Sequence, residues 1–192
     1  EHRYLHSFTP RRSSVLDFVI HSHPCGMLIA FLRSDLQADL LGKVPMPLSA
    51  PSSDAVILKA LGAAAIGLMA TSHWSPDIDN AASRALVTKW KAAFPDRPLT
   101  YYGTQGYDAG RLIASALKQT GGVDDIEALR TALRKADFQS VRGSFAFGPN
   151  QHPLQDWYLV DVVAGEDGNP TTRIKKKLIE NYGDSYAQAC KL

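Results

Sequence analysis

The chain has 192 residues, of which 45% are hydrophobic and 21% are charged, a composition typical of a folded globular protein rather than a disordered one. Its formal net charge is +2, and its dense basic run is confined to residues 173–177 (RIKKK), so nucleic acid is not an expected partner. No apolar run reaches the roughly 20 residues that cross a bilayer.

Residues 1–26 are predicted to form a poorly defined N-terminal tail. The apolar part of this segment is interrupted by Asp17 and by histidine and proline, so it does not fit a signal peptide. In a strand, His21, His23 and Cys25 would face one side and could converge on zinc or copper. No fourth ligand is visible, so we predict neither a metal site nor a cofactor.

Residues 27–75 alternate between strand and helix patterns. A strand end followed by a helix is expected over residues 27–42, and residues 43–49 carry alternate prolines that suit a strand edge. A helix capped by Ser52 or Ser53 and ended by Gly62 comes next, followed by a buried strand leading to residue 72. This order predicts an α/β sandwich.

Residues 79–136 contain three amphipathic helices. Asp79 or Asn80 is expected to cap the first, and the adjacent Tyr101 and Tyr102 are expected in the turn before the second. Asp124 or Asp125 is expected to begin the third, with a capping box between Asp124 and Glu127. The apolar stripe expected to be buried on the second helix is Tyr107, Ala109, Leu112, Ile113, Ala116 and Leu117. The buried stripe of the third is expected to be Ile126, Leu129, Ala132 and Leu133.

From residue 138 the apolar period changes from helical spacing to two. This change predicts strands at residues 143–148 and 156–165, then a turn and an antiparallel return over residues 170–179. A short helix near residues 183–190 is expected to close the chain.

The order of five segments carries a resemblance to a known family: SSDAVILKALGAAAIG, SHWSPDIDN, YYGTQGYDAGRLIASAL, ADFQSVRGSFAFGPNQHPLQDWYL and SYAQACKL. From about residue 35 to residue 192 the chain resembles the C-terminal half of type I periplasmic substrate-binding proteins of ABC transporters, in the leucine/isoleucine/valine-binding branch. The segment NQHPLQDWYL is similar to members that take aromatic carboxylates. The resemblance implies a partial α/β fold, with incomplete three-layer lobes and a C-terminal antiparallel hairpin.

The resemblance also implies a domain division and a function. Residues 27–75 would belong to the second lobe, residues 76–137 would be helices of the first, and residues 138–192 would make the hinge crossings and the terminal helix. The expected function is non-catalytic binding of amino acids or small, possibly aromatic, carboxylates as the solute-binding component of an ABC importer. The expected compartment is the periplasm, and the expected partner is the membrane permease of the importer. A truncated remnant or interaction domain that binds no solute is the alternative.

The resemblance implies six ligand-binding residues: Ser49, Ala50, Ser52, Trp74, Tyr102 and Gln105. Amino-acid binders of the family place an acidic residue in the loop at residues 48–53, but this chain has no carboxylate before Asp54. An ordinary α-amino acid is therefore disfavoured, because a desolvated ammonium without a partner is costly.

A serine hydrolase is a further alternative, because Ser72, His73 and Asp77 lie close together in sequence. Catalytic triads, however, bring their members from separate elements, and the chain has no Gly-x-Ser-x-Gly turn. We therefore predict no catalytic residues.

Overall fold

A computed structural model describes residues 17–20, 25–41 and 43–190. Within them, a four-stranded antiparallel sheet is built around β3. Its strands are β1 (Met69–Ser72), β2 (Phe145–Phe147), β3 (Pro153–Ala164) and β4 (Pro170–Tyr182). β1 and β2 pair with different stretches of β3, with Ser72 opposite Tyr158 and Phe145 opposite Gln155. β4 follows β3 along nearly its whole length.

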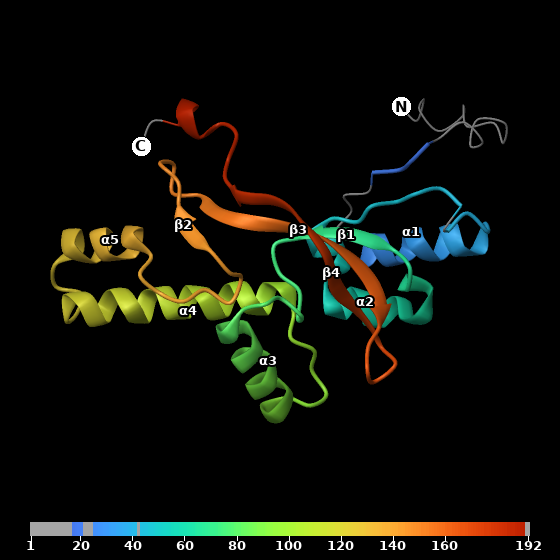
Figure 1. The fold of residues 1–192 in the computed structure, drawn as a ribbon, viewed down its shortest axis with the longest axis horizontal. Coiled ribbons are helices and arrows are strands. Elements are labelled where there is room, and N and C mark those ends of the chain that lie inside the picture. Colours follow the sequence, from blue (N-terminus) through green and yellow to red (C-terminus); the bar gives the residue numbers. More distant parts are fainter. Residues whose placement is uncertain (1–16, 21–24, 42, 191–192) are drawn as a thin grey trace, which may run out of the picture.

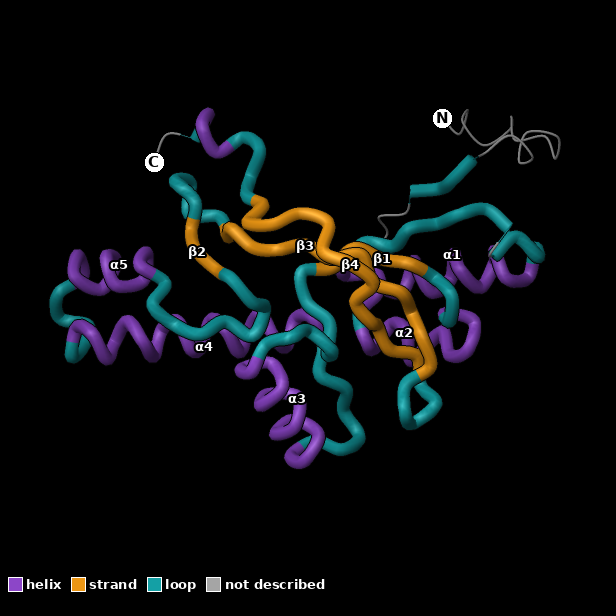
Figure 2. The backbone as a smooth tube through the Cα atoms, viewed as in Figure 1, coloured by secondary structure: helices purple, strands orange, loops and turns teal. Residues whose placement is uncertain are grey.

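Among the described residues, two pairs of α-helices lie at opposite ends of the molecule, and α3 (Ala81–Ala93) extends from near its middle (Figure 1). They are α1 (Cys25–Gln37), α2 (Ala55–Leu61), α3 (Ala81–Ala93), α4 (Tyr101–Thr120) and α5 (Ile126–Lys135). We call the region of α1, α2 and β1 the α1–α2 end, and the region of α4, α5 and β2 the α4–α5 end. β3 and β4 run between the two ends (Figure 2). This arrangement confirms the α/β class and the C-terminal antiparallel hairpin.

The largest apolar cluster lies at the α1–α2 end and around the central strand. α1 contributes Leu28 and Leu32, and β3 contributes Tyr158 and Val160. The other buried members of this cluster are Met46, Leu48, Ile57, Ala70, Trp74 and Ile78. A second small cluster, of Leu58, Ala65 and Val162, continues it along β3.

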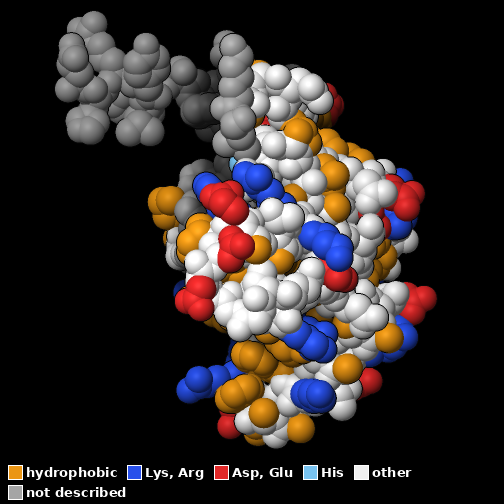
Figure 3. Space-filling model, turned by 90° about the vertical axis from the view of Figure 1, so that its left-hand side faces the viewer, with side chains coloured by type: hydrophobic (Ala, Val, Ile, Leu, Met, Phe, Trp, Pro, Cys, Tyr) orange, Lys and Arg blue, Asp and Glu red, His pale blue; other side chains and the backbone are white. Residues whose placement is uncertain are grey.

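The α4–α5 end buries mainly small or polar side chains. The buried positions of α4 are Thr104, Asp108 and Ala116. The predicted apolar stripe was therefore partly wrong, since Tyr107 is 39% exposed and Ile113 is 52% exposed. On α5, Ile126 was also expected inside but is 57% exposed. Figure 3 views this end and shows hydrophobic side chains at the surface among charged ones.

The helix ends follow local capping chemistry, with three differences from expectation. Asn80 caps α3 through Ser83 N, as predicted. Asp125, one of the two residues expected to begin α5, is its cap, in place of the predicted Asp124 capping box. Asp54, rather than Ser52 or Ser53, caps α2 because both serines lie in a short 3₁₀ turn, η2 (Ala50–Ser53).

The beginning of α4 also differs, since Thr100 accepts a hydrogen bond from Gly103 N and caps the helix one residue before the tyrosine pair. Tyr101 and Tyr102 therefore form its first turn rather than a loop. At the other end, Gly121 has φ of 73° and closes the helix.

The segment before β1 contains less strand than the sequence predicted. Residues 27–30 are helical, and residues 43–49 form only isolated bridges, one of them between Leu48 and Ala70. A further 3₁₀ turn, η3 (Gly62–Ala65), precedes β1. Another, η4 (Ala187–Ala189), stands where the final helix was expected. Most of the predicted tail, with His21 and His23 of the alternative metal site, lies outside the described residues.

Candidate functional site

The segment before α2 folds back on itself through hydrogen bonds between its own residues. The hydroxyl groups of Ser49 and Ser52 are 2.9 Å apart, and Ser53 Oγ donates to Ala50 O at 3.1 Å. Ala50 and Ser52 are buried, with 3% and 0% of their surface exposed, whereas Ser49 is partly exposed. Of the three predicted residues in this segment, only Ser49 presents its side chain to solvent.

Asp54 connects this segment to α4. One carboxylate oxygen accepts from Val56 N at 3.0 Å, which caps α2, and the other accepts from Tyr101 N at 3.0 Å. The side chain is buried, with 5% exposed. Both oxygens are thus occupied by backbone donors from two different helices.

The first turn of α4 presents the tyrosine pair. The ring of Tyr102 is 53% exposed and meets Tyr101 edge to face, with centroids 5.1 Å apart. Tyr101 is half-buried, and burial raises the pKa of its hydroxyl above the ordinary value. One turn further along, Gln105 lies partly exposed.

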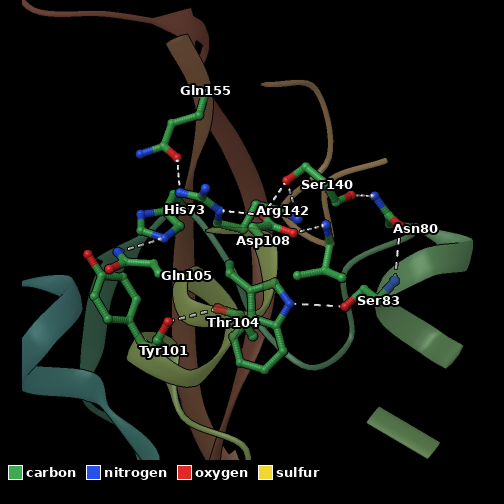
Figure 4. A network of polar contacts seen from close by, with 12 residues as sticks. His73, Asn80, Ser83, Tyr101, Thr104, Gln105, Asp108, Ser140, Arg142 and Gln155 are labelled. Carbon is green, nitrogen blue, oxygen red and sulfur yellow. Dashed lines mark hydrogen bonds and ion pairs between the residues drawn. The ribbon is translucent and has the colours of Figure 1, made fainter. Parts of the chain in front are cut away.

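His73, in the loop after β1, lies against Tyr101 and Gln105 and is 1% exposed (Figure 4). Its ring centroid is 4.5 Å from that of Tyr101 and 5.5 Å from that of Trp157, and its Nε2 is 3.4 Å from Gln105 Nε2. Its Nδ1 is buried without a hydrogen-bond partner among the described residues. Burial first, and then the positive charge of Arg142, lower the pKa of His73 to about 3, so the ring is neutral.

A buried ion pair fastens α4 to the segment before β2 and to β3 (Figure 4). Arg142 Nε donates to Asp108 Oδ2 at 2.8 Å, and Arg142 Nη1 donates to Gln155 Oε1 at 2.8 Å. The Asp108 carboxylate also accepts from Ser140 Oγ at 2.6 Å and from Val141 N at 3.0 Å. A buried ion pair with this many hydrogen bonds fixes the position of α4, whose first turn carries the two tyrosines.

Trp74 is 4% exposed, and its Nε1 donates to Ser83 Oγ at 3.0 Å, which ties the loop after β1 to α3. It lines a cavity of about 20 Å³, which has room for a water molecule but not for an aromatic ring. The cavity lies where the two ends meet, because its lining comes from both: Ala50, Ser53, Asp54, Ala55, Leu58, Ser72, Trp74, Pro76, Leu99, Tyr101, Thr171 and Thr172.

The structure brings the predicted residues to this junction with unequal exposure. Ala50 and Trp74 line the cavity, while Tyr102 and Gln105 lie on the first two turns of α4. The sequence did not predict that Asp54, His73 and Tyr101 also contribute to the junction. The nearest signal was the resemblance, which pointed to the loop at residues 48–53 and to Tyr102.

The residues of the alternative triad have other partners. Ser72 Oγ donates to Trp74 O at 2.6 Å, and Asp77 accepts from Ser75 Oγ and from Ile174 N. His73 instead contacts Gln105 and the two aromatic rings. This geometry gives Ser72 no adjacent base and so does not support a hydrolase.

Comparison with known families gives a match to the family described as periplasmic binding protein over residues 11–169. The chain belongs to the periplasmic binding protein family. The match begins earlier than residue 35, from which the sequence resemblance was traced. Among the described residues, none of the helices has the length and apolarity needed to cross a membrane.

Individual relatives agree with the family. A Leu/Ile/Val-binding protein homolog of Brucella abortus is 28% identical over 113 residues, which are 58% of this chain and 29% of that protein. An ABC transporter substrate-binding protein from Sphaerobacter thermophilus has 26% identity and a TM-score of 0.81, covering 90% of this chain and 47% of that one. A solute-binding protein of an R. palustris ABC transporter, solved with benzoate, has 29% identity and a TM-score of 0.77, covering 92% and 46%.

The chain of this periplasmic binding protein therefore spans under half the length of these relatives. The two solved structures are named as solute-binding or substrate-binding proteins of ABC transporters.

Proposed function

We propose that this chain acts in the extracytoplasmic solute-binding component of an ABC importer, and that its solute is a small carboxylate, with aromatic carboxylates favoured over amino acids. The observation that carries the proposal is the match, over nearly the whole chain, to the solute-binding protein that was solved with benzoate. The non-binding remnant or interaction domain remains the alternative to be tested.

The junction favours a solute without an ammonium group. The segment at residues 49–53 contains no carboxylate, and the next one, Asp54, already accepts from two backbone amides. An ammonium placed here would lose water without gaining a charged partner, which is unfavourable. An aromatic carboxylate has no ammonium group, so it does not need an acidic partner.

The six predicted residues divide into contacts and supports. We propose direct contact for those with exposed surface, which are Ser49, Tyr102 and Gln105. The remaining three residues are Ala50, Ser52 and Trp74. They are buried, and they would form the wall behind the contact residues. Since the cavity itself holds about 20 Å³, the solute would lie over it, between the two ends of the molecule.

Transport requires two further partners and a movement. A solute-binding protein of this kind delivers to a membrane permease, and the periplasm is the proposed compartment. Solute bound between the two ends would shift the population from open toward closed arrangements, with β3 and β4 as the connection that bends.

Isothermal titration of the 192-residue chain with benzoate, 4-hydroxybenzoate and leucine tests the proposal. We expect saturable heat with the aromatic carboxylates and none with leucine. The Tyr102→Ala variant should weaken binding about 2- to 13-fold, since a stacked ring contributes about 0.5–1.5 kcal/mol. Tyr186→Ala is the matched control, because Tyr186 is 79% exposed near the C-terminus, away from the junction.

Each other outcome contradicts part of the proposal. Saturable heat with leucine alone would make the protein an amino-acid binder. Silence with all three compounds would favour the alternative of a domain that binds no solute. Equal losses in Tyr102→Ala and Tyr186→Ala would remove Tyr102 from the site.

A further inference from the structure

Asp54 makes a contact that differs from those of the other acidic or amide helix caps in the described chain. Asp125 and Asn80 each accept from an amide of the helix that they begin, α5 and α3. Asp54 does the same for α2 and also accepts from the first amide of α4. A single carboxylate thus joins the starts of two helices that belong to opposite ends of the molecule.

The energetics of this contact favour a firm connection. The first amides of a helix have no partner within the helix, and its N-terminus carries partial positive charge. Hydrogen bonds from such amides to a carboxylate are stronger than those between neutral groups. Because Asp54 is 5% exposed, water competes little for its two oxygens.

The position of the contact gives it a consequence for the site. Tyr101 N belongs to the turn that carries Tyr102 and lies one turn before Gln105, while Asp54 immediately follows the segment at residues 49–53. The length of this connection fixes how far the tyrosine pair lies from that segment. Serine or threonine, the usual short caps, has one oxygen and could serve α2 but not both helices in this geometry.

We propose that Asp54 is a positioning residue, whose carboxylate holds the first turn of α4 against the segment at residues 49–53 and so sets the spacing of the solute-binding face. The inference rests on the proposed function only because it takes the positioned residues to be those that bind solute. Its test uses no solute, so the two proposals can fail separately.

Amide hydrogen exchange measured by NMR on the unmodified chain is the first test. Tyr101, Ala81 and Ile126 are the first residues of α4, α3 and α5, and a side-chain acceptor is described only for the amide of Tyr101. We expect the Tyr101 amide to exchange about tenfold or more slowly than the other two, because a charged acceptor holds it. Equal exchange of the three amides would overturn the proposal, whatever the variants do.

The Asp54→Asn variant is the second test, because it replaces one of two acceptor oxygens by a donor of the same size. Asp125→Asn is the matched control, since Asp125 caps its helix with one oxygen only. We expect Tyr101 protection to fall in Asp54→Asn and to stay unchanged in Asp125→Asn. Protection that survives in a folded Asp54→Asn variant would contradict the proposal.

The spacing itself can be measured with spin labels on Lys59→Cys in α2 and Lys118→Cys in α4, after Cys25 and Cys190 are changed to Ser. Both lysines are exposed on their helices. Pulsed electron resonance should give a broader distance distribution in Asp54→Asn than in Asp125→Asn. Identical distributions in the two variants would show that the carboxylate does not set the spacing.

Discussion

The imidazole of His73 is enclosed by two aromatic rings and lies near the positive charge of Arg142, which would repel a protonated ring, so protonation works against the fold. Its pKa is lowered from the ordinary 6.5 to about 3. A histidine whose pKa is lower in the folded chain stabilises the fold fully above its unfolded pKa. That contribution is lost as the pH falls from 6.5 toward about 3.

We therefore expect the free energy of unfolding to fall by about 1.4 kcal/mol per pH unit below about pH 6 because of this one proton. The His73→Phe variant keeps a ring beside Tyr101 but cannot be protonated, so it should lack that component of the slope. His152→Phe, at an exposed position, should retain it. Urea unfolding between about pH 6 and pH 5 measures the slopes, and equal slopes in wild type and His73→Phe would contradict the assignment.

Local sequence reasoning could predict one of the two bonds of Asp54 but not the other. A cap before α2 was expected from the pattern, although the predicted cap was Ser52 or Ser53 and not the adjacent Asp54. The second bond joins positions 47 apart in the chain and depends on how α4 approaches α2. His73 was missed for the same reason, because its surroundings come from β3 and α4 rather than from adjacent residues.

Among the elements, the strands followed their sequence pattern more closely than α4 did. Alternation of apolar residues predicted the β3–β4 hairpin, and alternate residues along the middle of β3 are buried in the core. On α4, the apolar period pointed to Tyr107 and Ile113, whereas Asp108 is buried instead. A carboxylate becomes a favourable buried residue only when a partner such as Arg142 is supplied from elsewhere, and the period of one helix carries no such information.

Two glycines on the exposed side of α4 offer a direct test of its surroundings. Added Cβ atoms at Gly106 and Gly110 would meet nothing within 4 Å. Gly106→Ala and Gly110→Ala should each stabilise the chain by about 1 kcal/mol, because alanine has the higher helix propensity. Gly121→Ala should destabilise it instead, since Gly121 has φ of +73°. Thermal unfolding measures all three, and a loss of stability in Gly106→Ala would mean that another element approaches α4 there.

The whole molecule has its apolar core on one side. Large buried apolar side chains gather around α1, β1 and β3, whereas those of the α4–α5 end are small. The buried apolar residues there are Ala116, Ala132, Ala136 and Val141. Polar contacts around Asp108 and Arg142 supply much of the order at that end.

We expect this asymmetry to appear as unequal local stability. Amides in α5 and the C-terminal half of α4 should exchange with solvent at least about tenfold faster than those in β1 and the middle of β3, because burial of apolar surface is the main stabilising contribution. Hydrogen exchange followed by mass spectrometry on peptides from these elements measures the difference. Uniform protection across the two ends would contradict it.

The placement of the indole rings gives the protein an internal optical reporter. Trp74 is buried between β1 and α3, Trp157 meets His73, and Trp90 lies on α3 with its Nε1 bonded to Arg97 O. Two of the three chromophores thus sit where the two ends join. Changes in emission wavelength will report rearrangement of that joint in real time, without any dye attached to the chain.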